Sequence, residues 1–148
     1  MREAGLTKQE RGLLTLTRVL MVLFFLATAL FITLPNWTLN YLTDIGQVFF
    51  NFRNSSITLG TENFWLILAI GYTATLTYVC LIAQNDFLRN IDYVKIVIFA
   101  KFVSTLGFVI CFLKFEYRFF CLVGAIIDFT IFLITWSCYH AAKKSRST

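Results

Sequence analysis

Four long apolar runs limit what this chain can fold into. They cover residues 19–34, 64–83, 93–115 and 117–141. A spanning helix needs roughly 20 apolar residues to cross a hydrocarbon core of about 30 Å, whereas a transmembrane β-strand has about ten residues of alternating polarity. The runs are too long for such strands and do not alternate. We therefore predict an all-α fold, an integral membrane four-helix bundle.

Composition extends this prediction to the whole chain. Hydrophobic residues make up 58% of the 148 residues and the mean hydropathy is +0.73, which exceeds the usual range of soluble domains. Four spans leave little room for a separate soluble domain. We expect residues 1–148 to form a single four-span domain whose surroundings are the lipid bilayer.

The first apolar run also has features of a signal peptide. Basic residues precede it, and Ala27-Thr28-Ala29 resembles a small-residue cleavage site. The apolar run nevertheless continues past Ala29. We expect it to be retained as the first span.

The connection of residues 35–63 is the longest between two apolar runs, and its first half is amphipathic. Apolar and aromatic residues recur there at near-helical spacing: Trp37, Tyr41, Leu42, Ile45, Val48, Phe49 and Phe52. Trp and Tyr favour the membrane interface. We predict a short interfacial helix after the first span; the alternative is that these aromatic side chains cap the bundle.

Basic residues are distributed unequally between the two sides of the predicted bundle. The side of both termini and the second connection carries nine: Arg2, Lys8, Arg11, Arg18, Arg89, Lys95, Lys143, Lys144 and Arg146. The other side carries three, Arg53, Lys114 and Arg118. The positive-inside rule then predicts that both termini are cytoplasmic and that residues 35–63 form an outer loop. Because the basic residues flank apolar runs, we expect no nucleic-acid partner.

Two charged residues lie inside the predicted spans. Asp128 follows the outer turn near Glu116 by about 12 residues, or roughly 18 Å, which places it near the bilayer centre. Lys101 lies within the third span. Each charge costs about 2.5 to 3.5 kcal/mol at a helix centre unless it is paired, neutralised or hydrated.

Hydroxyl groups at a similar depth complete a predicted polar layer. Ser104 and Thr105 lie on the third helix, and Thr75 lies on the second. Lys101 either pairs with Asp128 or extends to the cytoplasmic interface, which leaves Asp128 to bond with Ser104 or Thr105. We take all five as candidates for a polar core or a ligand site. The layer either locks helix packing, binds a ligand, ion or proton, or recognises a partner subunit.

Signatures of catalysis and of cofactor binding are missing from the sequence. The four cysteines all lie in apolar segments without a CxxC motif, and His140 is the only histidine. No cluster has metal-ligand spacing, and no nucleotide-binding or hydrolase motif occurs. We expect no metal, no cofactor and no enzymatic activity.

These observations favour a non-catalytic accessory or scaffolding component of a membrane assembly, one that associates with itself or with a larger membrane complex. The alternative is a small carrier or ligand-binding membrane protein that uses Asp128 and Lys101. A membrane enzyme is a third hypothesis.

Overall fold

The computed structural model describes residues 5–34, 45, 48, 59–114 and 118–146, and within them the fold consists of helices without strands. The long helices are α1 (Lys8–Thr33), α3 (Leu59–Asn85), α5 (Val94–Lys114) and α6 (Arg118–Arg146). Each belongs to a helical segment long and apolar enough to cross a membrane. The predicted all-α fold with four spans is thus confirmed. The predicted interfacial helix and most of the outer loop lie outside the described residues.

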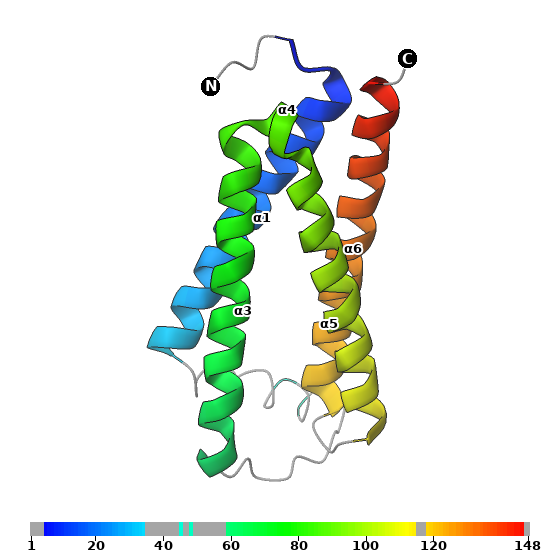
Figure 1. Cartoon of the computed structure of the whole chain (residues 1–148). Helices are drawn as coiled ribbons and strands as arrows, with labels where there is room; N and C mark the ends of the chain where they lie inside the picture. The colour runs from blue at the N-terminus through cyan, green and yellow to red at the C-terminus, as the bar shows by residue number, and fades with distance from the viewer. Residues whose placement is uncertain (1–4, 35–44, 46–47, 49–58, 115–117, 147–148) are drawn as a thin grey trace.

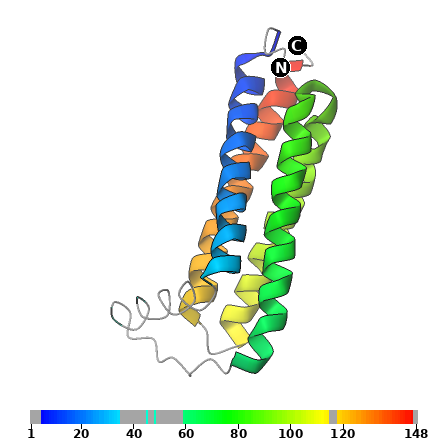
Figure 2. The same cartoon turned by 90° about the vertical axis from the view of Figure 1, so that its left-hand side faces the viewer.

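The helices form two hairpins that pack against each other (Figures 1 and 2). Helix α1 packs along α3, and α5 packs along α6. The short helices α4 (Phe87–Asn90) and η1 (Ile91–Tyr93) join α3 to α5. They lie at the same end of the bundle as the start of α1 and the end of α6 (Figure 1). We call this the terminal end.

Helices α1 and α6, like α3, extend beyond the apolar runs. Helix α1 begins at Lys8 because Thr7 and Glu10 form a capping box: Thr7 Oγ1 accepts from the Glu10 amide, and the Thr7 amide donates to Glu10 Oε2. Helix α6 continues to Arg146, with basic residues in its last turn, where the helix dipole favours cations. Both extensions project the helix ends past the predicted spans.

Two clusters of buried apolar residues lie in the terminal half of the bundle, and Phe119, Cys121 and Ala125 are buried nearer the other end. One cluster of buried residues lies at the terminal end: Leu6, Leu13, Leu14, Ala83, Phe87, Ile91, Val94, Ile98, Tyr139 and Ala142. A second joins α1, α3 and α5: Leu20, Phe24, Leu76, Val79, Cys80 and Val97. Large apolar side chains such as Phe25 and Phe99 lie instead on the outer surface, as lipid contact requires.

Polar contacts join three elements at the terminal end. The Arg146 guanidinium pairs with the buried Glu10 carboxylate at 2.5 Å and also donates to the carbonyl of Leu88 in α4. The hydroxyl groups of Thr7 and Ser145 are 2.9 Å apart. These contacts hold the end of α6 against the start of α1.

The cytoplasmic orientation of the terminal end is a prediction of the charge distribution. A cysteine-free background carrying Ser56→Cys should react with an impermeant maleimide from outside intact cells, because residue 56 belongs to the predicted outer loop. A matched Gln9→Cys variant should react only after permeabilisation. Labelling of Ser56→Cys only from the cytoplasmic side would reverse the orientation.

Candidate functional site

The two charges inside the spans form a buried ion pair. Lys101 Nζ lies 2.7 Å from Asp128 Oδ1, and the two side chains are only 6% and 8% exposed. The second carboxylate oxygen, Oδ2, accepts a hydrogen bond from Ser104 Oγ at 2.5 Å. Of the arrangements that the sequence leaves open, the structure has the direct pair, with Ser104 added to it.

Helix geometry explains how these three side chains meet. Lys101 and Ser104 are three residues apart on α5, so they share one face of that helix. Asp128 lies on the antiparallel α6. Counted from the turn between the helices, the Cα of Lys101 is 13 residues from Lys114 and that of Asp128 is ten from Arg118, a difference in level of about 5 Å at 1.5 Å per residue. The long, flexible lysine stem spans this difference.

Close packing of α5 on α6 brings the pair together. A Cβ atom built on Gly124, one turn before Asp128, would lie 2.8 Å from the ring of Phe108. The absence of a side chain at Gly124 therefore lets the Phe108 ring lie directly on the α6 backbone. Small residues permit this approach between membrane helices.

Two aromatic rings complete the surroundings of the Lys101 ammonium. Its nitrogen is 4.9 Å from the ring centroid of Phe24 in α1 and 5.4 Å from that of Tyr72 in α3. Both distances lie within the range of cation–π attraction. Together with Asp128 in α6, the Lys101 side chain thus contacts all three of the other long helices.

Neither ring is recognisable from the sequence as part of the site. Phenylalanine and tyrosine are abundant in this chain, and neither residue type indicates by itself that it faces a cation. Tyr72 is further fixed by its hydroxyl, which donates to the carbonyl of Ala100 in α5 at 2.9 Å. The sequence feature that could have indicated Tyr72 is its position within the spans, at a depth similar to that of Lys101.

The two threonine candidates do not bond to the carboxylate. Thr105 is buried beside the pair, but its hydroxyl donates to the carbonyl of Lys101 at 2.7 Å. Thr75 is exposed, and its hydroxyl donates to the carbonyl of Gly71 in its own helix. The expectation for Thr75 is corrected: its depth is similar, but at 100° per residue it faces outward while Tyr72 and Thr73 face inward.

Thr73 of α3 makes a polar contact at a depth similar to that of the ion pair. Its buried side chain accepts a hydrogen bond from Thr28 Oγ1 of α1 at 2.8 Å. This bond joins the two helices of the first hairpin. Polar contacts near this depth therefore occur in both hairpins, and the buried ion pair belongs to the second.

No protein family, curated protein or solved structure matches the chain. The chemistry of the site follows from its own geometry. Among the described residues, no group of three or more His, Cys, Asp or Glu side chains is placed to hold a metal ion, and the four cysteines are free thiols. His140 lies on the outer surface, with its ring centroid 4.4 Å from that of Trp136.

The geometry of the ion pair specifies one packing of the four helices. Both oxygens of Asp128 accept hydrogen bonds, and the Lys101 ammonium is enclosed by a carboxylate and two rings. A rotation or shift of either helix would leave a buried charge without its partner, which is strongly unfavourable. The pair therefore makes other registers of α5 against α6 energetically unfavourable.

Proposed function

We propose that this small multi-pass membrane protein is a non-catalytic accessory or scaffolding component that assembles with itself or with a larger membrane complex. The observation that supports this is the internal pairing of its intramembrane charges. Lys101 and Asp128 are bound to groups of the same chain, and they hold the helices in one register. A chain fixed in this way can present its outer helix faces to a partner as rigid surfaces.

The outer faces have the composition that such a role needs. Large apolar side chains are exposed along α1 and α6, among them Phe25, Ile32 and Ile126. Association of membrane helices depends on close packing of such faces. The apolar faces therefore allow contacts with other spanning helices as well as with lipid.

A second candidate function is a small carrier or ligand-binding protein that uses Lys101 and Asp128. The observation that favours it is the presence of ionisable side chains near the middle of spanning helices, where such residues mark transport paths and proton relays. In this case the pair would separate during each cycle, and Asp128 would exchange Lys101 for a proton or a ligand.

Purification of the tagged full-length chain from its native membrane in a mild detergent distinguishes the two. The scaffolding role predicts a membrane partner, or further copies of the chain, at a constant stoichiometry. The carrier role predicts retention of a small molecule or ion that Asp128→Asn abolishes while the protein still folds. A monomer that retains neither partner nor further copies would contradict the scaffolding proposal.

A further inference from the structure

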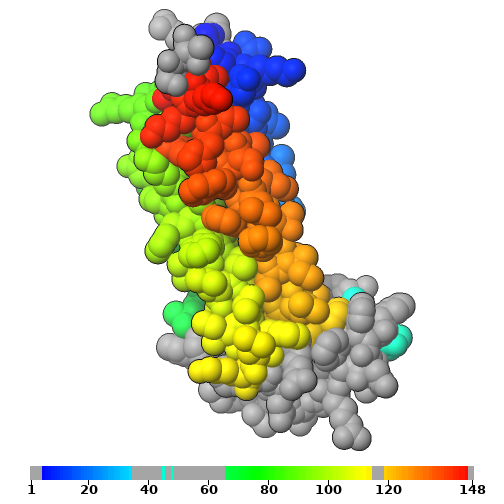
Figure 3. All heavy atoms as spheres, turned by 90° about the vertical axis from the view of Figure 1, so that its right-hand side faces the viewer, coloured from blue at the N-terminus to red at the C-terminus, as the bar shows by residue number. Residues whose placement is uncertain are grey.

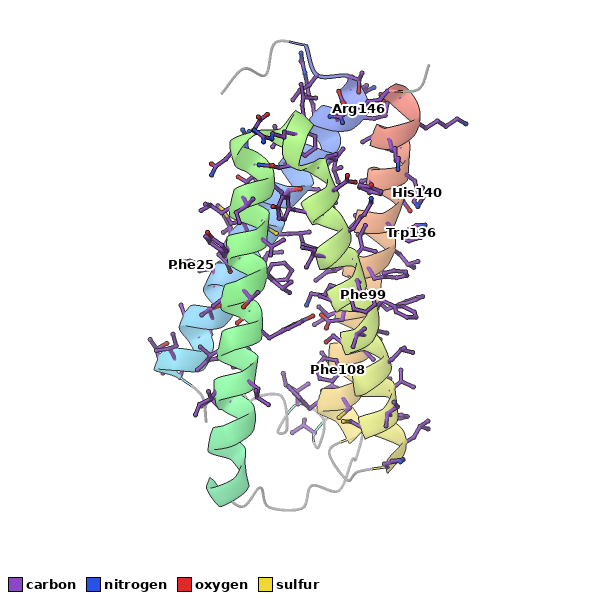
Figure 4. All side chains as sticks on the ribbon, in the orientation of Figure 1. Phe25, Phe99, Phe108, Trp136, His140 and Arg146 are labelled. Atoms are coloured by element: carbon purple, nitrogen blue, oxygen red, sulfur yellow. The ribbon has the colours of Figure 1, made fainter. Side chains whose placement is uncertain are left out.

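The outer face of the second hairpin carries a continuous series of aromatic rings, here called the aromatic strip. It consists of Phe102 of α5 and Phe129, Phe132, Trp136 and His140 of α6. Along α6 the successive ring centroids are 6.2, 5.9 and 4.4 Å apart, and Phe102 lies 5.5 Å from Phe132. Figure 4 shows Trp136 and His140 on the side of α6 that faces away from α1 and α3. The strip therefore lies on the outer surface of the bundle.

Two lysines lie at the terminal end of this strip. The spacing from Phe129 through Trp136 and His140 to Lys143 keeps all four on one face of α6. On α5, Lys95 shares a face with Phe102 in the same way, and its ammonium is 5.8 Å from the ring centroid of Tyr139 in α6. Figure 3 shows α5 and α6 side by side on this face of the molecule. The same surface thus carries aromatic rings in its apolar part and cations at its end.

The length of this surface matches one leaflet of a bilayer. Phe129 and Lys143 are 14 residues apart, or about 21 Å along the helix at 1.5 Å per residue. Half of the hydrocarbon core measures about 15 Å, and the headgroup region adds roughly 5 to 7 Å. With the lysines among the headgroups, Phe129 then lies close to the bilayer centre.

Asp92 interacts with both lysines and partly compensates their charge. Lys95 forms an ion pair with Asp92 at 2.7 Å. Lys143 is exposed and has no hydrogen bond or ion pair within the described residues, and it interacts electrostatically with Asp92. Two lysines and one carboxylate leave this surface with a net positive charge of one at the level of the lipid phosphates.

We propose that the aromatic strip, together with Lys95 and Lys143, binds one anionic phospholipid of the leaflet that surrounds the terminal end. Its phosphate contacts the two ammonium groups and its acyl chains lie along the rings. Negative headgroups attract basic residues at the membrane surface. A second copy related by a twofold axis along the membrane normal would place the same lysines opposite each other, so charge complementarity favours the lipid over a dimer. This inference is independent of the proposed scaffolding role.

Fluorescence of Trp136 provides a local test. The full chain with Trp37→Phe and Trp65→Phe retains Trp136 as its single tryptophan. It is reconstituted into vesicles of phosphatidylcholine and phosphatidylglycerol in which one lipid or the other carries brominated acyl chains, which quench tryptophan. We expect phosphatidylglycerol to occupy the site about fivefold more strongly than phosphatidylcholine, the ratio that corresponds to about 1 kcal/mol for one net positive charge.

Substitution of the lysines tests the assigned contacts. Lys143→Gln should lower the ratio to near one, and Lys95→Gln should lower it at least as far, because it leaves the Asp92 carboxylate without its ion-pair partner beside the phosphate. Lys8→Gln with Arg11→Gln, which removes two exposed charges from α1, is the matched control and should leave the ratio unchanged. Lys143 makes no hydrogen bond or ion pair within the described residues, so its replacement should not change the melting temperature followed by circular dichroism.

Three outcomes would overturn the proposal. The first is equal quenching by the two lipids, and the second is a loss of preference in the α1 control as large as in Lys143→Gln, since this would indicate general surface charge. The third is weak quenching by both lipids together with cross-linking of chains through Trp136→Cys. That result would identify a second copy as the occupant.

Discussion

Replacement of Asp128 by leucine is expected to lower the free energy of unfolding by about 3 to 5 kcal/mol, because it leaves the Lys101 ammonium buried without a counter-charge. Asp128→Asn keeps an oxygen acceptor for Lys101, and its amide nitrogen can donate to Ser104 Oγ, so its cost should be smaller, roughly 1 to 2 kcal/mol. Unfolding in mixed micelles with increasing denaturing detergent, followed by circular dichroism, measures both. Thr75→Val removes an exposed hydroxyl at a similar depth and should change stability by less than about 0.5 kcal/mol.

A double variant measures the energetic coupling between the two charges, apart from their contacts with other groups. Lys101→Met with Asp128→Leu removes both charges, and apolar replacements of a buried pair are often close to neutral. We therefore expect the double variant to be more stable than either single variant. Single effects that simply add in the double variant would show that the two charges are not energetically coupled.

The bundle and the ion pair were predictable from the sequence for different physical reasons. The bilayer requires long apolar helices, so the spans are visible as apolar runs. Lys101 and Asp128 are recognisable because each would be costly alone at that depth. Ser104 follows from its position one turn after Lys101. These inferences need only position along a helix, which the sequence provides.

Rotation about the helix axis was harder to predict. In a soluble protein, apolar periodicity identifies the buried face, but in a membrane both the interior and the lipid-facing surface are apolar. Depth alone therefore includes Thr75 in the polar layer although its side chain is exposed, and does not identify the rings of Phe24 and Tyr72. The start of α1 could have been predicted from the sequence, because Thr7 and Glu10 have the spacing of a capping box.

Gly124→Ala is expected to destabilise the second hairpin by about 1 to 3 kcal/mol, the usual cost of overpacking. The added Cβ would lie 2.8 Å from the Phe108 ring. That ring also makes an edge contact with Phe120, at 5.8 Å between centroids, so it lies between two parts of α6 and has little room to move aside. Gly107→Ala in α5 is the matched control, because a Cβ there would meet nothing within 4 Å; it should be neutral or slightly stabilising, since alanine favours helix more than glycine does.

A second substitution identifies the cause of this loss. Phe108→Leu should restore stability in the Gly124→Ala background if the clash with the ring is responsible, and should fail to do so if the chain requires glycine at residue 124 for another reason. Gly124 precedes Asp128 by one helical turn, so separating α5 from α6 at Gly124 should also lengthen the contact between Lys101 and Asp128. We therefore expect Gly124→Ala to cost less in the Lys101→Met, Asp128→Leu background, where no ion pair remains to be stretched. An equal cost in both backgrounds would mean that the close approach at Gly124 and the ion pair stabilise the hairpin independently.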